Sequence, residues 1–340
     1  MEQEKILVYL PSPLGDAILC TPALRSLRER FSEAWICFLA KGVVKDVLSP
    51  SDFADEWIEA PKKSVELIHT LRQHHFDKAI LFKNSFGSAM ITSLARIPER
   101  IGYARDGRGI FLTSKLHPQK NSDGTFKPVV MIDYYLEIAK HLECDISNRR
   151  LGLSVDAGDA EAIQQKLKTF LPSDGPIVIL VPGGAFGPSK CWLSERFAKT
   201  ADHIIERFGA TVVVSVAPNE AEEKIAGDIC RLSKNKVYNL AETPVSLGEL
   251  KALFARAELV ITNDTGPRHI AIALDRKVIT LFGPNDPAWT RTGYENEIEI
   301  TGHAACAPCA KPKCTEPSHL CMEAISVERV CEEAGKMLAG

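Results

Sequence analysis

The chain alternates short apolar runs with amphipathic stretches of helical spacing, in two successive series. In the first series the apolar runs are residues 6–10, 35–39 and 78–82, and the helical stretches are 16–31, 64–74, 86–95 and 131–142. In the second, the runs are 177–181, 211–216, 258–262 and 277–282, and the stretches are 194–208, 219–232 and 246–257. Strands that alternate with helices of this length form parallel sheets with right-handed crossovers. We therefore predict an α/β fold with two Rossmann-like domains, whose ligands bind beyond the carboxyl ends of the strands.

The length of 340 residues suits two domains of ordinary size. We expect the first domain at residues 1–155 and the second at 177–325. A linker region at 156–176 ends in a turn-forming segment with two prolines and a glycine. Residues 326–340 are expected to form a C-terminal helix, for which packing back on the N-terminal domain is one option.

The composition excludes several classes of protein. A net charge of −3 implies no general attraction to nucleic acid. No apolar run approaches the length that spans a bilayer. The polar residues 1–5 lead directly into a strand, so no secretory signal is expected and the default compartment is the cytoplasm.

A polar turn at residues 263–269 follows the β-branched run 258–262 and precedes the apolar run 270–274. A turn there places backbone N–H groups and the positive end of a helix dipole at the carboxyl edge of a sheet, where they can bind a phosphate or diphosphate. Gly266 lets a ligand approach the backbone closely, and Pro267 suits the first helical turn. The second half of the chain is therefore predicted to bind a nucleotide-like anion.

One further loop follows the first strand of each half. In the first loop, Gly15 permits a tight turn and Asp16 opens the next helix, so Asp16 is either a helix cap or a base that takes a proton from a hydroxyl. In the second loop, three glycines and two prolines lead to Lys190. Lys190 either neutralises a phosphate or is a solvated surface lysine.

Other strand ends carry polar side chains that also have two explanations each. Glu220, with Glu223 beyond it, suits a ribose, but a solvated glutamate at a helix start explains the position equally well. His269 either hydrogen-bonds a phosphate or caps and packs. The loop 282–287 is expected to lie beside the 263–269 turn at the sheet edge.

Ten cysteines are many for a cytoplasmic chain, and four of them lie close together in the sequence. These four are Cys306, Cys309, Cys314 and Cys321. Four thiols can bind a metal tetrahedrally, and the first gap suits such a site better than the later gaps do. The alternatives are free thiols, or a disulfide in an oxidised preparation.

Several motifs of other enzyme classes are missing. The chain has no Walker lysine loop, no Gly-x-Ser-x-Gly elbow and no Asp-x-Asp pair of the kind that holds a divalent ion on a nucleotide sugar. A metal-independent transfer reaction fits this pattern better than a metal-dependent one.

The loops together resemble glycosyltransferase family 9, which contains the ADP-heptose:lipopolysaccharide heptosyltransferases. The segments that carry the resemblance are residues 6–8 with 15–27, 182–192, 262–274 and 282–287, together with Cys306, Pro308, Cys309, Cys314, Cys321 and Met322. They cover nearly the whole chain in the family's order, and the 186–188 segment is most similar to the second heptosyltransferases. Pro267 and Arg268 depart from the family, where an apolar pair is more frequent, so Arg268 is a candidate for an added phosphate contact or an altered choice of sugar.

The resemblance implies a GT-B architecture, with two parallel sheets facing a central cleft. The N-terminal domain would bind the acceptor and the C-terminal domain the nucleotide sugar. It implies an inverting transfer that requires no cofactor, with Asp16 as general base and Lys190 balancing charge on the departing diphosphate. The donor-binding residues would be Gly183, Gly184, Asp264, Thr265, Gly266 and His269, with Glu220 or Glu223 on the ribose.

The implied partners are an ADP-heptose donor and an anionic, lipid-linked acceptor of the lipopolysaccharide inner-core type. Candidate acceptor-binding residues are Gly15, Arg105 and Arg108. The basic stretch 96–120 faces that acceptor, forms a solvated basic face, or makes transient contact with the inner membrane surface. Rival functions are transfer of another sugar, a nucleotide-sugar epimerase, and a non-catalytic nucleotide-sugar-binding protein; the presence of both Asp16 and Lys190 speaks against the last.

Overall fold

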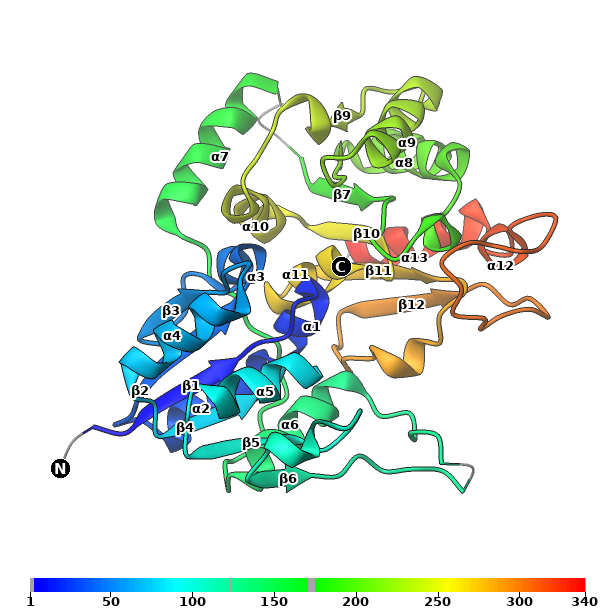
Figure 1. The fold of residues 1–340 in the computed structure, drawn as a ribbon. Coiled ribbons are helices and arrows are strands. Elements are labelled where there is room, and N and C mark those ends of the chain that lie inside the picture. The colour runs from blue at the N-terminus through cyan, green and yellow to red at the C-terminus, as the bar shows by residue number, and fades with distance from the viewer. Residues whose placement is uncertain (1–2, 123, 171–174, 340) are drawn as a thin grey trace. The chain divides into compact units, whose positions relative to one another are not determined.

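The computed structural model describes residues 3–122, 124–170 and 175–339, and the chain divides into two compact units (Figure 1). Unit 1 comprises residues 1–154 and 289–292, and unit 2 comprises 155–288 and 293–340. Each unit holds one six-stranded sheet in which all neighbouring strands are parallel. The prediction of an α/β fold with two parallel sheets is confirmed.

The sheet of unit 1 has the strand order β3-β2-β1-β4-β5-β6. Its strands are β1 (Lys5–Tyr9), β2 (Trp35–Ala40), β3 (Glu56–Glu59), β4 (Lys78–Leu81), β5 (Glu99–Tyr103) and β6 (Ser114–Leu116). Its helices are α1 (Leu14–Leu19), α2 (Thr21–Arg30), α3 (Gly42–Leu48), α4 (Ser64–His74), α5 (Phe86–Leu94) and α6 (Met131–His141), with a 3-10 turn η1 (Arg108–Phe111).

Alternate residues of the central strand β1 point to opposite faces of this sheet, and both sets are buried. Leu7 and Tyr9 pack in one cluster with Leu67 of α4 and Ala89 of α5. The helical stretch expected at 16–31 is in fact two helices, because α1 ends at Leu19 and α2 restarts with Pro22 in its first turn, where no N–H is required.

The sheet of unit 2 has the order β12-β11-β10-β7-β8-β9. Its strands are β7 (Ile177–Val181), β8 (Thr211–Val214), β9 (Tyr238–Asn239), β10 (Leu259–Asn263), β11 (Lys277–Phe282) and β12 (Glu297–Thr301). Its helices are α7 (Ala157–Phe170), α8 (Ser194–Phe208), α9 (Glu220–Leu232), α10 (Leu247–Arg256), α11 (Gly266–Ala273), α12 (Leu320–Glu323) and α13 (Val327–Ala339). The 3-10 turns η2 (Pro188–Lys190), η3 (Leu240–Glu242) and η4 (Pro287–Trp289) complete the second half of the chain.

Helices α8, α9, α12 and α13 contribute to one core of unit 2. Helix α13 buries Val330 and Ala334 in this core and contacts α8. The expected linker region forms much of α7, which packs on α10; residues 171–174 of that region lie outside the described residues. A capping box of Ser246 and Glu249 starts α10.

Both sheets have the same topology, and this decides where a ligand can bind. In each sheet, the first three strands follow one another outward from the centre to one edge, and the next three run from the centre to the other edge. The strand order therefore reverses between β1 and β4 in the first sheet and between β7 and β10 in the second. Loops diverge at the carboxyl edge of such a change, and ligands of open parallel sheets bind there. Among the described residues, no helix is both long enough and apolar enough to cross a membrane.

Candidate functional site

The first of these two positions carries Asp16. Helix α1 begins directly after β1, and Asp16 lies in its first turn without making a capping hydrogen bond, so the explanation as a helix cap is wrong. Burial raises the pKa of the Asp16 carboxyl above its usual value of 3.8. The side chain is half-buried, as is its neighbour Gly15. A carboxylate in this setting is a stronger base than one in water.

Lys83 follows β4, the strand beside β1, and the sequence analysis did not single it out. Its Nζ lies 5.0 Å from the centre of the Tyr9 ring. Burial lowers the pKa of Lys83, and the charge of Lys41 lowers it further. Lys83 directly follows the predicted strand 78–82, and this position at a strand end could have marked it as a candidate site residue.

Arg108 is a scaffold residue in this structure, because its side chain has no exposed area. Its guanidinium donates hydrogen bonds to the carbonyls of Tyr103 at 2.7 Å and Lys83 at 2.5 Å, and to Asn84 Oδ1 at 2.9 Å. It therefore ties the end of β5 to the end of β4 and has no surface with which to touch an acceptor. The expectation of a direct contact from Arg108 is not met, whereas Arg105 stays partly exposed.

In unit 2, the loops after β7 and β10 are held together by Asn263. This fully buried side chain donates from Nδ2 to the carbonyl of Pro182 at 2.6 Å. Its Oδ1 accepts from the backbone N–H of Trp192 at 3.4 Å. A Cβ placed on Gly184 would lie 3.9 Å from Thr265, so the glycine loop runs close to the head of α11.

Lys190 lies against this junction and is not a solvated lysine, since its side chain is 11% exposed. Its Nζ donates to both the carboxylate and the backbone carbonyl of Asp264, each at 2.8 Å. Asn285, from the loop after β11, donates to the same carboxylate at 3.0 Å, so the 282–287 loop does lie beside the 263–269 turn as expected. Burial by itself raises the pKa of Asp264, but Lys190 and Arg268 outweigh it and hold that pKa at about 2.

Arg268 is fully buried beneath the turn. It makes a bidentate pair with Glu297, at 2.6 and 3.1 Å, and reaches Asp264 at 3.4 Å. The expectation of a direct phosphate contact is therefore wrong, because the guanidinium has no exposed area and is engaged by carboxylates on both sides.

The head of α11 presents the partly exposed residues Thr265 and Gly266. The N–H of Gly266 is in the first helical turn, where no intrahelical acceptor exists. Just behind it, burial and the charge of Arg268 lower the pKa of His269 to about 3, so the imidazole is neutral at ordinary pH. Its Nδ1 is buried and has no hydrogen-bond partner among the described residues. His269 is thus a buried, neutral imidazole that carries no positive charge.

On the other side of the glycine loop the structure places Glu222, which the sequence analysis did not single out. Its carboxylate occupies the space that a Cβ on Gly183 would need, and it accepts a hydrogen bond from Ala217 N–H at 3.0 Å. Glu220 and Glu223, on the same helix, are exposed. The three-residue spacing from the helix cap Asn219 to Glu222 was the available signal, because the third helical position points back at the loop.

Comparisons with known proteins agree with this geometry. The family model for glycosyltransferase family 9 (heptosyltransferase) matches residues 64–319, more than half of the chain. The chain belongs to glycosyltransferase family 9. It is therefore a glycosyltransferase.

Two solved structures and one sequence relative show how far this family 9 chain matches others. Lipopolysaccharide heptosyltransferase 2 of Salmonella typhimurium is 28% identical, over 98% of this chain and 99% of that protein. The structure of E. coli ADP-heptose lps heptosyltransferase II matches with a TM-score of 0.80 and 25% identity, covering 98% of each chain. The family 9 glycosyltransferase of Veillonella parvula matches with a TM-score of 0.84 at 22% identity, covering 100% of this chain and 99% of that one. The fold is that of the GT-B heptosyltransferases.

The cysteine segment of this family 9 chain, residues 306–321, packs on the loop that carries Lys190. Ser189 donates from its N–H to the carbonyl of Pro312 at 3.2 Å and from Oγ to the carbonyl of Lys311 at 2.5 Å. A ring nitrogen of His319 lies 2.6 Å from the Ser189 carbonyl. These hydrogen bonds fix the position of Ser189, next to Lys190 in the loop.

The four clustered cysteines do not form a metal site in the described part of the chain. All four are free thiols, and no group of three or more His, Cys, Asp or Glu side chains there is arranged to hold a metal ion. Burial raises the pKa of Cys321, and the charges of the other three cysteines raise it further.

Proposed function

We propose that this protein transfers a heptose from ADP-heptose to an acceptor of the lipopolysaccharide inner-core type, with inversion at the anomeric carbon. The observation that carries the proposal is Lys190 beside Asp264, next to the head of α11 and the glycine loop, at the change of direction in the sheet. This is a site for a diphosphate. A relative with 25% identity over 98% of the chain is named for ADP-heptose, which supports the choice of donor.

In this proposal unit 2 is the donor domain. The N–H groups of Thr265 and Gly266 bind the diphosphate, and Gly183 and Gly184 allow it to approach the backbone. His269, as a neutral imidazole, donates a hydrogen bond to a sugar or phosphate oxygen. The ribose lies against α9, where Glu222 at Gly183 supports a contact better than Glu220 does.

Unit 1 is the acceptor domain, and Asp16 is the general base. As the acceptor hydroxyl attacks, its proton passes to Asp16, the new bond forms from the acceptor oxygen to the anomeric carbon, and the bond from that carbon to the diphosphate oxygen breaks. The attack comes from the face opposite the leaving group, which inverts the anomeric configuration. Lys190 and the positive end of α11 balance the charge on departing ADP, so the step needs no metal ion.

The structural metal predicted at Cys306, Cys309, Cys314 and Cys321 takes no part in this reaction. It stays a prediction that elemental analysis of protein purified without chelator would decide: about one equivalent of bound metal supports it, and reactive thiols without metal contradict it.

Product analysis tests the proposed function. We expect incubation with ADP-heptose and a deacylated inner-core oligosaccharide to yield ADP and an oligosaccharide one heptose longer, with inverted anomeric configuration by NMR. Transfer only from a different nucleotide sugar would replace the donor, and an isomerised donor without transfer would show an epimerase. Retention of configuration would remove the role proposed for Asp16.

Transient contact with the membrane surface and location in the cytoplasm are also part of the proposal. They rest on the basic stretch 96–120 and on the lipid-linked nature of the proposed acceptor. Fractionation of cells that express the chain at native level would check both.

A further inference from the structure

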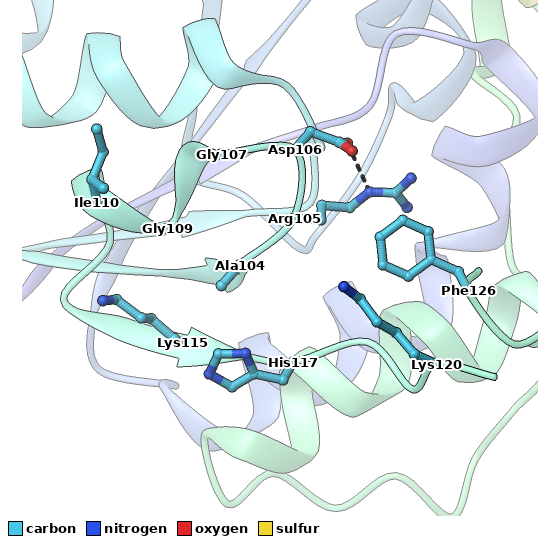
Figure 2. A pocket seen from close by; sticks show the side chains of 10 residues that line it. All are labelled: Ala104, Arg105, Asp106, Gly107, Gly109, Ile110, Lys115, His117, Lys120 and Phe126. Carbon is cyan, nitrogen blue, oxygen red and sulfur yellow. Dashed lines mark hydrogen bonds and ion pairs between the residues drawn. The ribbon is translucent and has the colours of Figure 1, made fainter. Parts of the chain in front are cut away.

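A hollow of about 440 Å³ lies at the carboxyl edge of the first sheet, beyond β5 and β6 (Figure 2). The turn after β5 contributes Arg105 and Asp106, and β6 contributes Lys115. The segment that follows β6 contributes His117 and Lys120. All of the residues that line the hollow belong to unit 1.

Two of its cations are held in place by an aromatic ring. Lys120 lies opposite Phe126 in an antiparallel bridge. The guanidinium of Arg105 lies 4.7 Å and the ammonium of Lys120 lies 5.5 Å from the centre of the Phe126 ring. Figure 2 shows both side chains beside this ring. Cation–π attraction of this kind fixes a charge without neutralising it.

The hollow carries an excess of positive charge. It contains three cations, Arg105, Lys115 and Lys120, against the single carboxylate of Asp106, which lies 2.9 Å from Arg105 Nε. Lys115 and Lys120 form no ion pair within the part of the chain that the structure describes. Two uncompensated positive charges in a concave site attract and retain an oxyanion. Lys115 and Lys120 are exposed, and they line a concave part of the surface.

We propose that this hollow binds an acidic group, a carboxylate or phosphate, carried by the saccharide acceptor near the hydroxyl that is glycosylated. The inference rests on the proposed function. β5 is separated from β1 by β4 alone, and strand spacing is about 4.8 Å, so the hollow begins about 10 Å along the sheet edge from the strand that positions Asp16. An acceptor that spans this distance would be held by its charge at one end while its hydroxyl reaches Asp16.

The test is a double variant, Lys115→Gln with Lys120→Gln, compared with the matched double variant Lys62→Gln with Lys63→Gln, whose lysines are exposed elsewhere in unit 1. The probe is a deacylated inner-core oligosaccharide. We expect the hollow variant to raise the KM for this acceptor roughly tenfold or more, with little change in kcat or in ADP binding. The control variant should match the wild type.

Three further arms identify the acidic group and its source. Two modified acceptors, one dephosphorylated and one with its carboxyl groups reduced, are compared with the wild-type enzyme. The modification that raises the KM to the value of the hollow variant identifies the group that is bound. An unchanged KM in the hollow variant, or an equal rise for both modified acceptors, overturns the proposal. It is also overturned if the variant loses binding to phosphatidylglycerol vesicles while the KM for the soluble oligosaccharide is normal, because the hollow is then a membrane contact.

Direct calorimetry with the oligosaccharide, without donor, separates this inference from the proposed function. If the hollow variant binds the oligosaccharide more weakly than the wild type does, and the wild type transfers no heptose, the hollow is supported and the proposed function is contradicted. If the wild type transfers heptose but the variant at Lys115 and Lys120 binds the oligosaccharide equally well, the proposed function is supported and the hollow is contradicted.

Discussion

At the scale of single residues, the Asp264 carboxylate organises the donor side. It accepts hydrogen bonds from Lys190 and Asn285, which lie in two different loops, and from the buried Arg268. An ionised carboxylate at this point holds the lysine ammonium beside the head of α11. For the diphosphate proposed to bind at the head of α11, the cation is thus already held nearby.

Asp16→Asn should lower kcat roughly 10²–10⁴-fold, because the amide cannot accept the proton of the acceptor hydroxyl. The affinity for ADP should change little. Since burial raises the pKa of Asp16, kcat/KM of the wild type should fall as the pH is lowered through a value above 3.8. Near-normal turnover in the Asn variant would show that another residue is the base.

Lys190→Ala should weaken ADP binding roughly tenfold or more, because a charge-assisted contact to the diphosphate is lost. Isothermal calorimetry measures this directly. Lys199→Ala, which removes an exposed lysine of α8, is the matched control and should bind ADP as the wild type does. Equal affinities for all three proteins would exclude the role of Lys190.

Arg268→Met should lower the free energy of unfolding by about 3–5 kcal/mol, because Glu297 would be left buried without its cation and Asp264 would keep only Lys190. Adding Glu297→Gln should recover part of that loss, since it removes one of the unpaired charges. Denaturant unfolding gives both values. A single variant as stable as the wild type would mean that the buried network contributes nothing net.

At the scale of elements, the cysteine segment and the Lys190 loop depend on each other. Gly187 has φ +145° and ψ 172°, a conformation that is essentially limited to glycine, and the carbonyl oxygen of Pro312 lies only 2.4 Å from where its Cβ would be. The loop can take this path only because position 187 has no side chain. The segment 306–321 thus contacts the Lys190 loop through backbone carbonyls.

Gly187→Ala should therefore lower the free energy of unfolding by about 1–3 kcal/mol and weaken ADP binding, because the loop must move away from Pro312. Gly227→Ala is the matched change in the interior of α9, where a Cβ would meet nothing within 4 Å. It should raise stability by about 1 kcal/mol. If both variants behave alike in thermal unfolding and calorimetry, the contact with Pro312 is unimportant.

Elements with a long periodic pattern were predictable from the sequence, and short edge strands were not. The helices at 64–74 and 194–208 match the expected bounds. In contrast, β3 has one buried residue, Ile58, and β9 has two residues in all. A hydrophobic period needs several turns or alternations before it can be recognised, and an edge strand buries too few side chains to show one.

At the scale of the whole molecule, stability should depend on pH through His269. Its pKa is lowered from 6.5 to about 3 by burial, so the unfolded chain binds a proton between these values and the folded chain does not. Stability should therefore fall as the pH drops from about 6.5 toward 3, by up to several kcal/mol. The low pKa of Asp264, about 2, adds a further loss between about 4 and 2.

Thermal unfolding from pH 7 to pH 4 checks this prediction. His269→Asn should flatten the pH dependence over that range, at some cost in stability at neutral pH. His75→Asn is the matched control, because His75 is exposed and in the left-handed conformation that asparagine tolerates. A wild type whose unfolding temperature is constant from pH 6.5 to 4 would contradict the assignment.

Local chemistry was enough to predict the parallel sheets, most helices and the glycine-bearing loops at strand ends, because period, propensity and turn residues act over neighbouring positions. It also brought Asp16, Lys190 and the 263–269 turn to attention. Only the tertiary structure decided that Arg268 and Arg108 are buried scaffold residues, that Glu222 lies on the glycine loop, and that Lys83 is beside Tyr9. Those roles depend on contacts such as Lys190 with Asp264, 74 positions apart, and on burial, which no local pattern records.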